Sequence, residues 1–337
     1  MIKQAIYDLL NGKDLSLDTT RQVMFQIMNG QATSAQIASF LTAMRMKGET
    51  IDEITACAMV MREKCQKLSP GRDVLDIVGT GGDEMNTFNI STVSALVISA
   101  GGVPVAKHGN RSVSSKCGSA DLLEALSVKI DLTAGQSEEI LRRIGICFMF
   151  APTYHTSMKY AAPVRRELSV RTVFNILGPL ANPAGANMQL LGVYDENLVE
   201  PLATVLSNLG VKRAMVVHGH DGLDEVTLTG TTTVCEVNGN MNSFFLTPEQ
   251  LGFKRCKMDE LIGGAPEDNA KIALSILNGQ KGPQRDIVLL NSALCLYMGY
   301  SQHTLRDCIK MAAEIIDSGR AREQLNNFIR LSNEVAQ

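Results

Sequence analysis

The chain has 337 residues, of which 45% are apolar and 20% charged, and its formal net charge is −3. This length exceeds the usual size of one hydrophobic core, so we expect two domains. The acidic balance argues against nucleic acid as a partner, because proteins that bind the phosphate backbone usually carry a basic face.

Cysteine usage and hydropathy indicate a reducing compartment. The eight cysteines include no Cys-x-x-Cys pair and lie mostly in apolar segments, which is typical of small core residues rather than of disulfides or a structural zinc site. There is no apolar run long enough for a bilayer and no charged-then-apolar leader at Met1. We therefore expect a cytoplasmic protein with no membrane partner.

The first seventy or so residues carry the apolar spacing of helices. Four short helices are predicted, ending near Asn11, Asn29, Gly48 and Leu68. The third and fourth open at capping boxes led by Thr33 and Thr50. Because Ser69-Pro70-Gly71 then breaks the pattern, residues 1–69 are predicted to form a helical domain.

From residue 70 to residue 337, strands and helices alternate, which favours a mostly parallel sheet covered by helices. Strands are predicted near 74–78, 103–106, 147–150, 189–193, 213–218 and 233–237. Three helical stretches are predicted to finish the chain, starting around Pro266, Arg285 and Ser301. The expected fold class is α/β, with a small N-terminal helical domain and a larger α/β domain.

A glycine loop follows the first predicted strand, in the segment Asp-Ile-Val-Gly-Thr-Gly-Gly-Asp from Asp76 to Asp83. Glycine lets the backbone approach an anion, and successive N–H groups in such a turn form a positive nest. The segment Asn89-Ile90-Ser91-Thr92 then caps an apolar run that extends to Ser99, so a helix N-terminus is expected to face the same point. The loop is either a phosphate site or an ordinary βα turn.

A second polar loop, from Lys107 to Ser115 and on to Asp121, follows the next strand. Two cations, a glycine and a cluster of hydroxyls suit a polyanionic ligand, and α/β sheets bind ligands at the carboxyl ends of their strands. A solvated surface loop is the alternative.

A third element, Asp221-Gly222-Leu223-Asp224-Glu225, follows the strand at 213–218. Adjacent carboxylates are ligands that Mg²⁺ prefers, and Mg²⁺ commonly bridges them to substrate phosphates; in isolation, an acidic surface turn explains them as well. The sequence lacks the Walker lysine pattern and a Gly-x-Gly-x-x-Gly that opens a helix. An ATP-hydrolysing P-loop and a dinucleotide-binding domain are therefore not expected.

Together with the segments 164–168 and 172–180, these motifs resemble the anthranilate phosphoribosyltransferase family of tryptophan biosynthesis, over essentially the whole chain. The resemblance implies transfer of the phosphoribosyl group of 5-phosphoribosyl 1-pyrophosphate (PRPP) to the amine of anthranilate, releasing pyrophosphate. It also implies a homodimer with two magnesium ions per subunit. The active site is expected between the domains, with a helical segment at about 160–180 joining the first domain in space.

The resemblance also assigns site residues. Those implied to bind PRPP are Gly79, Gly82, Asp83, Thr87, Asn89, Ile90, Ser91, Thr92, Lys107, His108, Gly109, Asn110, Arg111, Ser112, Val113, Ser114, Ser115 and Ser119. Those implied to bind anthranilate are Gly79, Asn110 and Arg165, and those implied to bind magnesium are Ser91, Asp224 and Glu225. Arg165 suits the anthranilate carboxylate because its guanidinium is a planar fork. His108 is the candidate catalytic residue, for a proton or hydrogen-bonding role, since the reaction requires no protein nucleophile.

Three positions depart from the family pattern. Glu84 and Ser169 stand where many members have glycine, and Thr156 follows His155 where proline is common. None of these departures removes an implied ligand. We expect them to affect kinetics and the entry of anthranilate more than activity itself.

Two rival classes share parts of this pattern. Pyrimidine nucleoside phosphorylases have the same architecture and a phosphate-binding glycine loop, but the loop from Lys107 to Asn110 and the pair Asp224-Glu225 argue against them. A non-catalytic relative that binds nucleic acid would show a basic groove and lose the carboxylates or Arg165. This chain is acidic overall and retains all of them.

Overall fold

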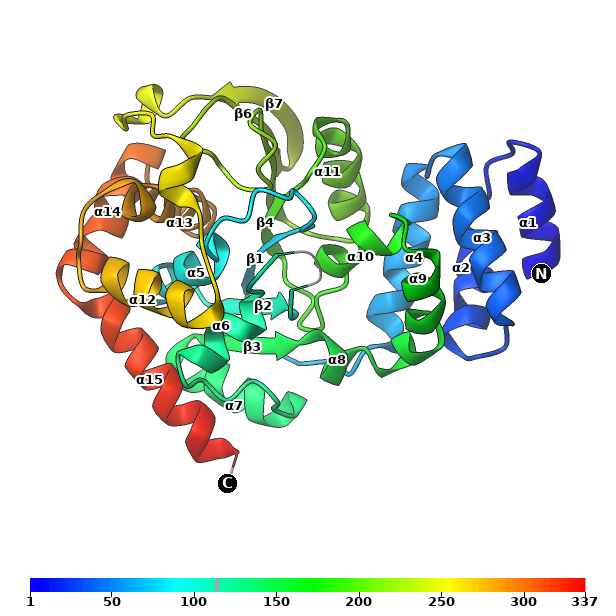
Figure 1. The fold of residues 1–337 in the computed structure, drawn as a ribbon, viewed down its shortest axis with the longest axis horizontal. Coiled ribbons are helices and arrows are strands. Elements are labelled where there is room, and N and C mark those ends of the chain that lie inside the picture. Colours follow the sequence, from blue (N-terminus) through cyan, green and yellow to red (C-terminus); the bar gives the residue numbers. More distant parts are fainter. Residues whose placement is uncertain (113–114, 337) are drawn as a thin grey trace.

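A single sheet forms the centre of the fold in the computed structural model, which describes residues 1–112 and 115–336 (Figure 1). Its strands lie in the order β3-β2-β1-β4-β5-β6-β7. Their bounds are β1 Leu75–Gly79, β2 Val105–Gly109, β3 Ile146–Phe150, β4 Met188–Gly192, β5 Arg213–Gly219, β6 Thr232–Asn238 and β7 Asn240–Leu246. The five strands β3, β2, β1, β4 and β5 are parallel to one another. Strand β6 pairs antiparallel with β5, and β7 pairs antiparallel with β6, at one side of the sheet. The α/β fold class is confirmed.

The carboxyl ends of the parallel strands meet at one edge of the sheet. Gly79 of β1 is in register with Gly192 of β4, and Gly109 of β2 with Phe150 of β3. The chain order of the strands reverses between β1 and β4, and such a switch point is where open α/β sheets bind ligands. The loops after β1, β2 and β5 all begin at this edge.

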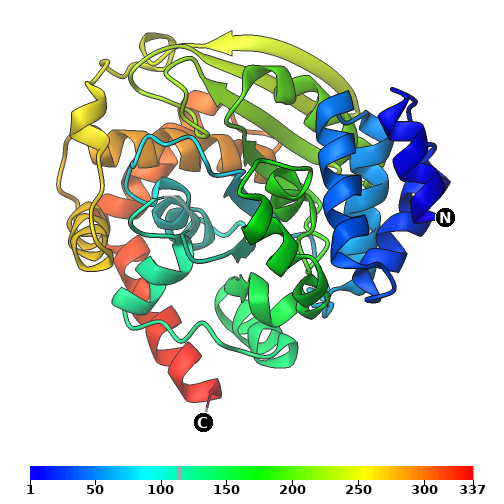
Figure 2. The ribbon, with the colours of Figure 1, turned by 45° about the vertical axis from the view of Figure 1, so that its right-hand side comes forward.

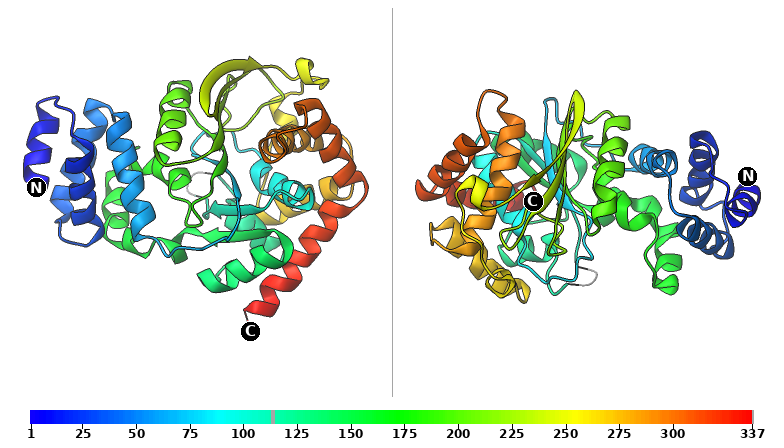
Figure 3. Two further views of the ribbon diagram at one scale, coloured as in Figure 1. Left: turned by 180° about the vertical axis from the view of Figure 1, so that it is seen from behind. Right: turned by 90° about the horizontal axis from the view of Figure 1, so that it is seen from above.

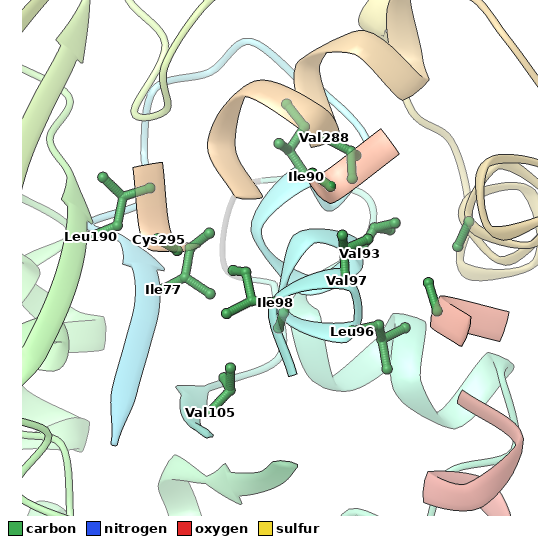
Figure 4. Close-up of a cluster of buried hydrophobic side chains, with 14 of the residues drawn as sticks. Ile77, Ile90, Val93, Leu96, Val97, Ile98, Val105, Leu190, Val288 and Cys295 are labelled. Carbon is green, nitrogen blue, oxygen red and sulfur yellow. The ribbon is translucent and has the colours of Figure 1, made fainter. Parts of the chain in front are cut away.

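Alternating side chains on the central strands build two apolar clusters, because successive strand residues point to opposite faces. Leu190 lies in one cluster and Leu191 in the other. The first cluster packs the strands against α5 (Ile90–Ala100) and α13 (Pro283–Gly299), as the side chains of Ile77, Ile98 and Cys295 show in Figure 4. This packing fixes α5 and its N-terminus beside β1.

The first domain contains α1 Ile2–Leu10, α2 Leu17–Met28, α3 Ser34–Lys47 and α4 Ile51–Lys64. Both predicted capping boxes are present, at Thr33 and Thr50. Helix α4 ends before the predicted limit at Leu68, because the backbone N–H groups that follow it bond to other segments. Gln66 N donates to Tyr154 O at 2.8 Å and Leu68 N to Pro183 O at 3.1 Å.

The chain returns to the first domain between β3 and β4. This return consists of α8 Ala151–Tyr154, the 3₁₀ helix η1 Thr156–Tyr160, α9 Ala162–Leu168 and α10 Phe174–Leu180. Helix α9 packs against α3 and α10 against α4, beside the bundle seen at one end of the molecule in Figures 2 and 3. The division of the chain at residue 69, with 160–180 on the helical side, stays a prediction.

The remaining helices are α6 Ser119–Ala125, α7 Ala134–Ile144, α11 Val199–Asn208, α12 Pro266–Leu277, α14 Leu305–Asp317 and α15 Arg320–Val335, with 3₁₀ turns η2 Glu196–Leu198, η3 Glu249–Leu251 and η4 Met258–Leu261. No helix in the described part of the chain is both long and apolar enough to cross a membrane.

The C-terminal part differs from prediction in two ways. Four helices rather than three lie in its described residues, because Gly319 with φ +81° separates α14 from α15. Strand β7 was not predicted, since its face is largely exposed and lacks a clear apolar alternation. It forms a hairpin with β6 through Gly239, whose φ of +75° suits a tight turn.

The two departures from family glycines lie at left-handed backbone positions. Glu84 has φ +61° in the glycine loop, and Ser169 has φ +50° at the C-terminal end of α9. Residues with a Cβ adopt this region at a cost, whereas glycine does not. The local backbone thus suits glycine, the residue that the family resemblance implies at both positions.

Candidate active site

Asp224 and Glu225 lie on the turn after β5, at the edge where the parallel strands end. A Cβ at Gly79 would collide with the Asp224 side chain, and one at Gly192 would collide with the Asp224 backbone. These two glycines end neighbouring strands in register. Their missing side chains provide the space in which the acidic turn crosses the sheet edge.

Two side chains hold this turn in place: a buried asparagine of α13 that sequence reasoning missed, and the half-buried Asp221 of the turn itself. Asn291 of α13 is fully buried, its Oδ1 accepts from Val226 N at 3.0 Å, and its Nδ2 donates to Val226 O at 2.9 Å. Asp221 accepts from Leu223 N at 3.1 Å. The backbone on both sides of the Asp224-Glu225 pair is therefore fixed. A lone asparagine in an apolar helix was the only available sequence signal.

The acidic turn connects the glycine loop to the start of α5. Gly81 N donates to Asp224 Oδ2 at 2.7 Å, and Ser91 N donates to Glu225 Oε1 at 3.2 Å. The carboxylates thus occupy N–H groups of the loop and of a helix N-terminus, both of which favour negative charge. Three motifs separated in the sequence meet at one point.

The charges at this point are crowded. Burial, followed by the charge of Asp83, raises the pKa of Asp224, and burial, followed by the charge of Asp224, raises the pKa of Glu225. Lys107 is buried beside them; its Nζ donates to Ile77 O at 2.5 Å and to Ser91 Oγ at 3.3 Å. Burial lowers the pKa of Lys107 although nearby carboxylates oppose this.

These groups fit a magnesium ion. Two adjacent carboxylates whose pKa values are raised by burial and by neighbouring negative charge gain stability from a cation, and oxygen ligands are the type that Mg²⁺ prefers. The Ser91 hydroxyl lies in the same group of contacts. Within the described residues, no three His, Cys, Asp or Glu side chains form a metal cluster by themselves. Further ligands would therefore come from Ser91, water or substrate phosphate.

The polar loop after β2 is closed by a carboxylate at the start of α6. Asp121 Oδ2 accepts from Ser112 N at 3.1 Å and from Gly118 N at 2.8 Å, and Asp121 Oδ1 accepts from Arg111 Nη1 at 2.9 Å. Arg111 also forms an ion pair with Glu124. Its guanidinium is therefore already paired, and its predicted role in binding donor phosphate would require exchange of these partners.

The other predicted residues of this loop lie near its two ends. Gly109 ends β2, where a Cβ would collide with the Ser119 hydroxyl. Asn110 O accepts from Ser119 Oγ at 3.2 Å, and Ser112 Oγ contacts Ser115. The predicted donor residues Val113 and Ser114 lie outside the described part of the chain. The binding roles of this loop stay predictions.

The expectation that the Asn89 side chain caps α5 is wrong. It precedes the helix, but its side chain does not cap it; Asn89 Nδ2 donates to Cys117 O at 2.9 Å, and Asn89 Oδ1 accepts from Asn269 Nδ2 at 3.0 Å. The helix also starts at Ile90, within the segment 89–92 that was predicted to cap it. The Asn89 amide instead joins the second loop to α12, because buried partners there satisfy it more fully.

A pocket of about 230 Å³ lies next to these contacts. It is lined by Thr87, which pairs with Ile262 in an isolated bridge, and by Ser115, Cys117 and Asn269. The polar side chains of Thr87, Ser115, Lys116 and Asn269 lie in a lining that is otherwise largely apolar. The position of the pocket between the predicted donor loops suits part of a sugar phosphate.

Ile90 and Thr92 point into the protein rather than into this pocket. Ile90 belongs to the apolar cluster under the sheet, so only its backbone is available to a ligand. Thr92 is buried, and its hydroxyl has no hydrogen-bond partner among the described residues.

His108 is buried and held in one orientation. Its backbone N–H donates to Asp76 Oδ1 at 3.2 Å, and its Nδ1 lies 3.1 Å from Gly178 O. Since a carbonyl only accepts, Nδ1 carries the proton and Nε2 presents a lone pair. Burial, with the neighbouring His155, lowers the pKa of His108 to about 3. The imidazole is neutral at pH 7 and suits an acceptor role more than a strong base.

His108 and His155 should make stability dependent on pH. Burial lowers the pKa of His155 to about 4, and the rings lie 5.0 Å apart. As pH falls below 6.5, the unfolded chain takes up protons that the folded protein does not, so the free energy of unfolding decreases. At pH 5 we expect a loss of about 1–2 kcal/mol for each histidine.

Urea unfolding of wild type and His155→Gln at pH 7 and pH 5 measures this decrease in the free energy of unfolding. The variant should lose roughly half of the histidine-dependent change. Burial raises the pKa of Asp76 to about 6, which acts in the opposite direction but is common to both proteins. An equal pH difference in the two proteins would contradict the prediction.

Arg165 lies on α9, on the side of the molecule that faces the helical domain. It is half-buried, burial lowers its pKa, and its Cζ lies 5.1 Å from the centroid of the Phe174 ring on α10. No residue in the described ranges forms a hydrogen bond or ion pair with its guanidinium. Its donors are thus available to a carboxylate, and among the described residues no hydrogen bond or ion pair joins it to the glycine loop.

The fold and this group of loops and carboxylates define a glycosyl transferase. Residues 71–322 match the glycosyl transferase family a/b domain, and residues 3–65 match the helical bundle domain of the same family. The chain is 77% identical over 338 residues to the anthranilate phosphoribosyltransferase of Ruminiclostridium cellulolyticum, covering 100% of this chain and 99% of that protein. The chain belongs to the anthranilate phosphoribosyltransferase family.

Solved structures agree with this family. The chain is similar to anthranilate phosphoribosyltransferase from Thermus thermophilus, with 42% identity, a TM-score of 0.93, and 98% and 99% of the two chains covered. It is also similar to the Saccharomyces cerevisiae enzyme in complex with PRPP and Mg, with 28% identity, a TM-score of 0.91, and 99% and 98% covered.

Proposed function

We propose that this chain transfers the phosphoribosyl group of PRPP to the amine of anthranilate, giving N-(5-phosphoribosyl)anthranilate and pyrophosphate, with magnesium as cofactor. The observation that carries the proposal is the meeting of the glycine loop, the α5 N-terminus, Lys107 and the pair Asp224-Glu225 at the switch point of the sheet. Relatives solved with PRPP and Mg, and with 4-fluoroanthranilate, support it.

The leaving group determines what the donor site must do. The bond from C1 of the ribose to the pyrophosphate oxygen breaks, so negative charge develops on pyrophosphate and positive charge at C1. Preorganised donors lower the barrier most when they face developing charge. The Gly81 N–H, the first turn of α5 and the ammonium of Lys107 supply such donors at one point.

Magnesium, when bound, would neutralise phosphate charge as a Lewis acid. Asp224, Glu225 and the Ser91 hydroxyl would hold it, and two ions per subunit are part of the proposal. Displacement of the carboxylates from Gly81 N and Ser91 N would release these N–H groups for phosphate oxygens.

The acceptor side needs orientation more than activation. An aromatic amine attacks C1 with its lone pair and then releases a proton. Correct placement of the amine against C1 therefore supplies most of the rate enhancement on the acceptor side. Arg165 would hold the anthranilate carboxylate as a guanidinium fork. The Nε2 lone pair of His108 is buried without a partner in the described chain, and it is the group we propose to accept a hydrogen bond from the substrate.

A fluorescence assay tests the function. Purified protein supplied with PRPP and Mg²⁺ is expected to consume anthranilate, seen as loss of its native fluorescence. Omission of PRPP or Mg²⁺ serves as the control and should leave the signal constant. Constant fluorescence over a broad range of Mg²⁺, together with phosphorolysis of thymidine or uridine, would instead assign the chain to the pyrimidine nucleoside phosphorylases.

The proposal includes a homodimer in the cytoplasm. Support for the dimer comes from large apolar side chains exposed on packed helices of the first domain, Tyr7 and Leu10 on α1 and Met46 on α3. Light scattering of the purified protein measures the mass. A monomer at micromolar concentration would remove this part of the proposal.

A further inference from the structure

Arg171, in the segment between α9 and α10, reaches the glycine loop after β1. Its Nη2 donates to Gly82 O at 2.5 Å, and its Cζ lies 4.2 Å from the centroid of the Tyr194 ring. Nη2 also lies 3.9 Å from Glu84 Oε1. One guanidinium thus connects the loop after β1, the loop after β4 and the segment that continues from α9.

The glycine loop, which runs from Thr80 to Asn86 after β1, has few other attachments. Its start is fixed by Thr80 N, which donates to Gly192 O at 2.9 Å, and its end by Asn86 O, which accepts from Gly263 N at 2.9 Å. Between these ends, two hydrogen bonds in the described structure join the loop backbone to other segments. They are Gly81 N to Asp224 Oδ2 and Arg171 Nη2 to Gly82 O.

These two attachments differ in what happens when ligands bind. If Asp224 bound magnesium, as the proposed function requires, it could release the Gly81 N–H to the substrate. The bond from Arg171 involves neither metal nor phosphate, and the ring of Tyr194 supports the guanidinium from a second side. Arg171 is thus the attachment that we expect to persist during binding.

The bond from Arg171 also determines which way a peptide group points. A trans peptide is planar, so its carbonyl and its N–H point in opposite directions. With Gly82 O held by Arg171, the Asp83 N–H points away from Arg171, and no described residue accepts a hydrogen bond from it. Gly82 has φ +76°, and without a Cβ this peptide could turn over and direct its carbonyl toward the phosphate.

We propose that Arg171 is a positioning residue for the donor loop: by binding Gly82 O it directs the Asp83 N–H at the pyrophosphate of PRPP. Glu84 contributes less to this orientation than Gly82 does. Its side chain is 82% exposed and 3.9 Å from Arg171, so the ion pair contributes little to the orientation. The inference rests on the proposed function for the identity of the ligand.

The test compares Arg171→Met with Arg171→Lys and a matched control. Arg171→Met removes the charge and the donors at similar length, and we expect the KM for PRPP to rise about tenfold while the KM for anthranilate changes less than about twofold. Arg171→Lys keeps a charged donor but loses the planar stack on Tyr194, so an intermediate rise is expected. Arg166→Met removes the same charge from exposed Arg166 of α9 and should match wild type.

Calorimetry with inorganic pyrophosphate and Mg²⁺, without anthranilate, separates this inference from the function. Weaker pyrophosphate binding by Arg171→Met than by Arg166→Met supports the positioning role even if wild type consumes no anthranilate. Equal pyrophosphate affinity in the two variants overturns the role even if wild type is active. Hydrogen exchange of residues 80–85 should also be faster in Arg171→Met, and unchanged exchange would contradict the proposed attachment.

Discussion

Replacing Asp224 by Asn and Glu225 by Gln in one protein is expected to abolish the response of the activity to Mg²⁺ and to lower kcat/KM at least about a thousandfold, or about 4 kcal/mol in the barrier. The amides retain an oxygen that can accept from Gly81 N and Ser91 N. They remove the negative charge that a divalent cation requires. The effect should therefore appear in catalysis rather than in folding.

Stability of the same double variant provides the second measurement. In the metal-free protein, burial and the charges of neighbouring carboxylates raise the pKa of both side chains. Their neutralisation should leave the metal-free thermal midpoint equal or higher, and Mg²⁺ should stabilise wild type but not the variant. Glu138→Gln with Glu139→Gln on α7 is a matched control, because it also neutralises two adjacent acids. A persistent Mg²⁺ response in the double variant would place the metal elsewhere.

Arg165→Ala is expected to raise the KM for anthranilate roughly thirtyfold to 150-fold, because a charge-assisted guanidinium–carboxylate contact contributes about 2–3 kcal/mol. The KM for PRPP should change much less, since no hydrogen bond or ion pair in the described structure joins Arg165 to the glycine loop. Steady-state kinetics with each substrate varied in turn measures both constants.

Two comparisons sharpen the Arg165 prediction. Arg166→Ala removes the same charge from the next residue and should leave the KM for anthranilate near that of wild type. Aniline lacks the carboxylate, so if it is used at all, Arg165→Ala should affect its use little. An unchanged KM for anthranilate in Arg165→Ala would refute the role of this residue.

The sequence identified the motifs because their local chemistry is distinctive. Glycines after a strand, a polar loop with two cations and an adjacent Asp-Glu pair each indicate a charged ligand. The six predicted strands are present, and the capping boxes at Thr33 and Thr50 formed as expected, since apolar periodicity and capping act over a few residues. The family followed from these motifs and their order.

Side-chain partners could not be predicted in the same way. Asn89 has the residue type of a helix cap, but its amide bonds to Cys117 and Asn269, which are distant in the sequence. Arg111 appeared available for phosphate, whereas it is paired with Asp121 and Glu124. Hydrogen-bond partners depend on which segments meet, and spacing along the chain does not contain that information.

By itself, then, the sequence determined the α/β class, the family and the three charged motifs, because these depend on local patterns and residue types. Only the tertiary structure decided that the motifs converge where β1 and β4 end, that two glycines make room for Asp224, and that Arg171 binds the donor loop. The physical reason is that these contacts join segments about 90 to 140 residues apart. Their geometry is set by packing of the sheet and helices, which no local pattern specifies.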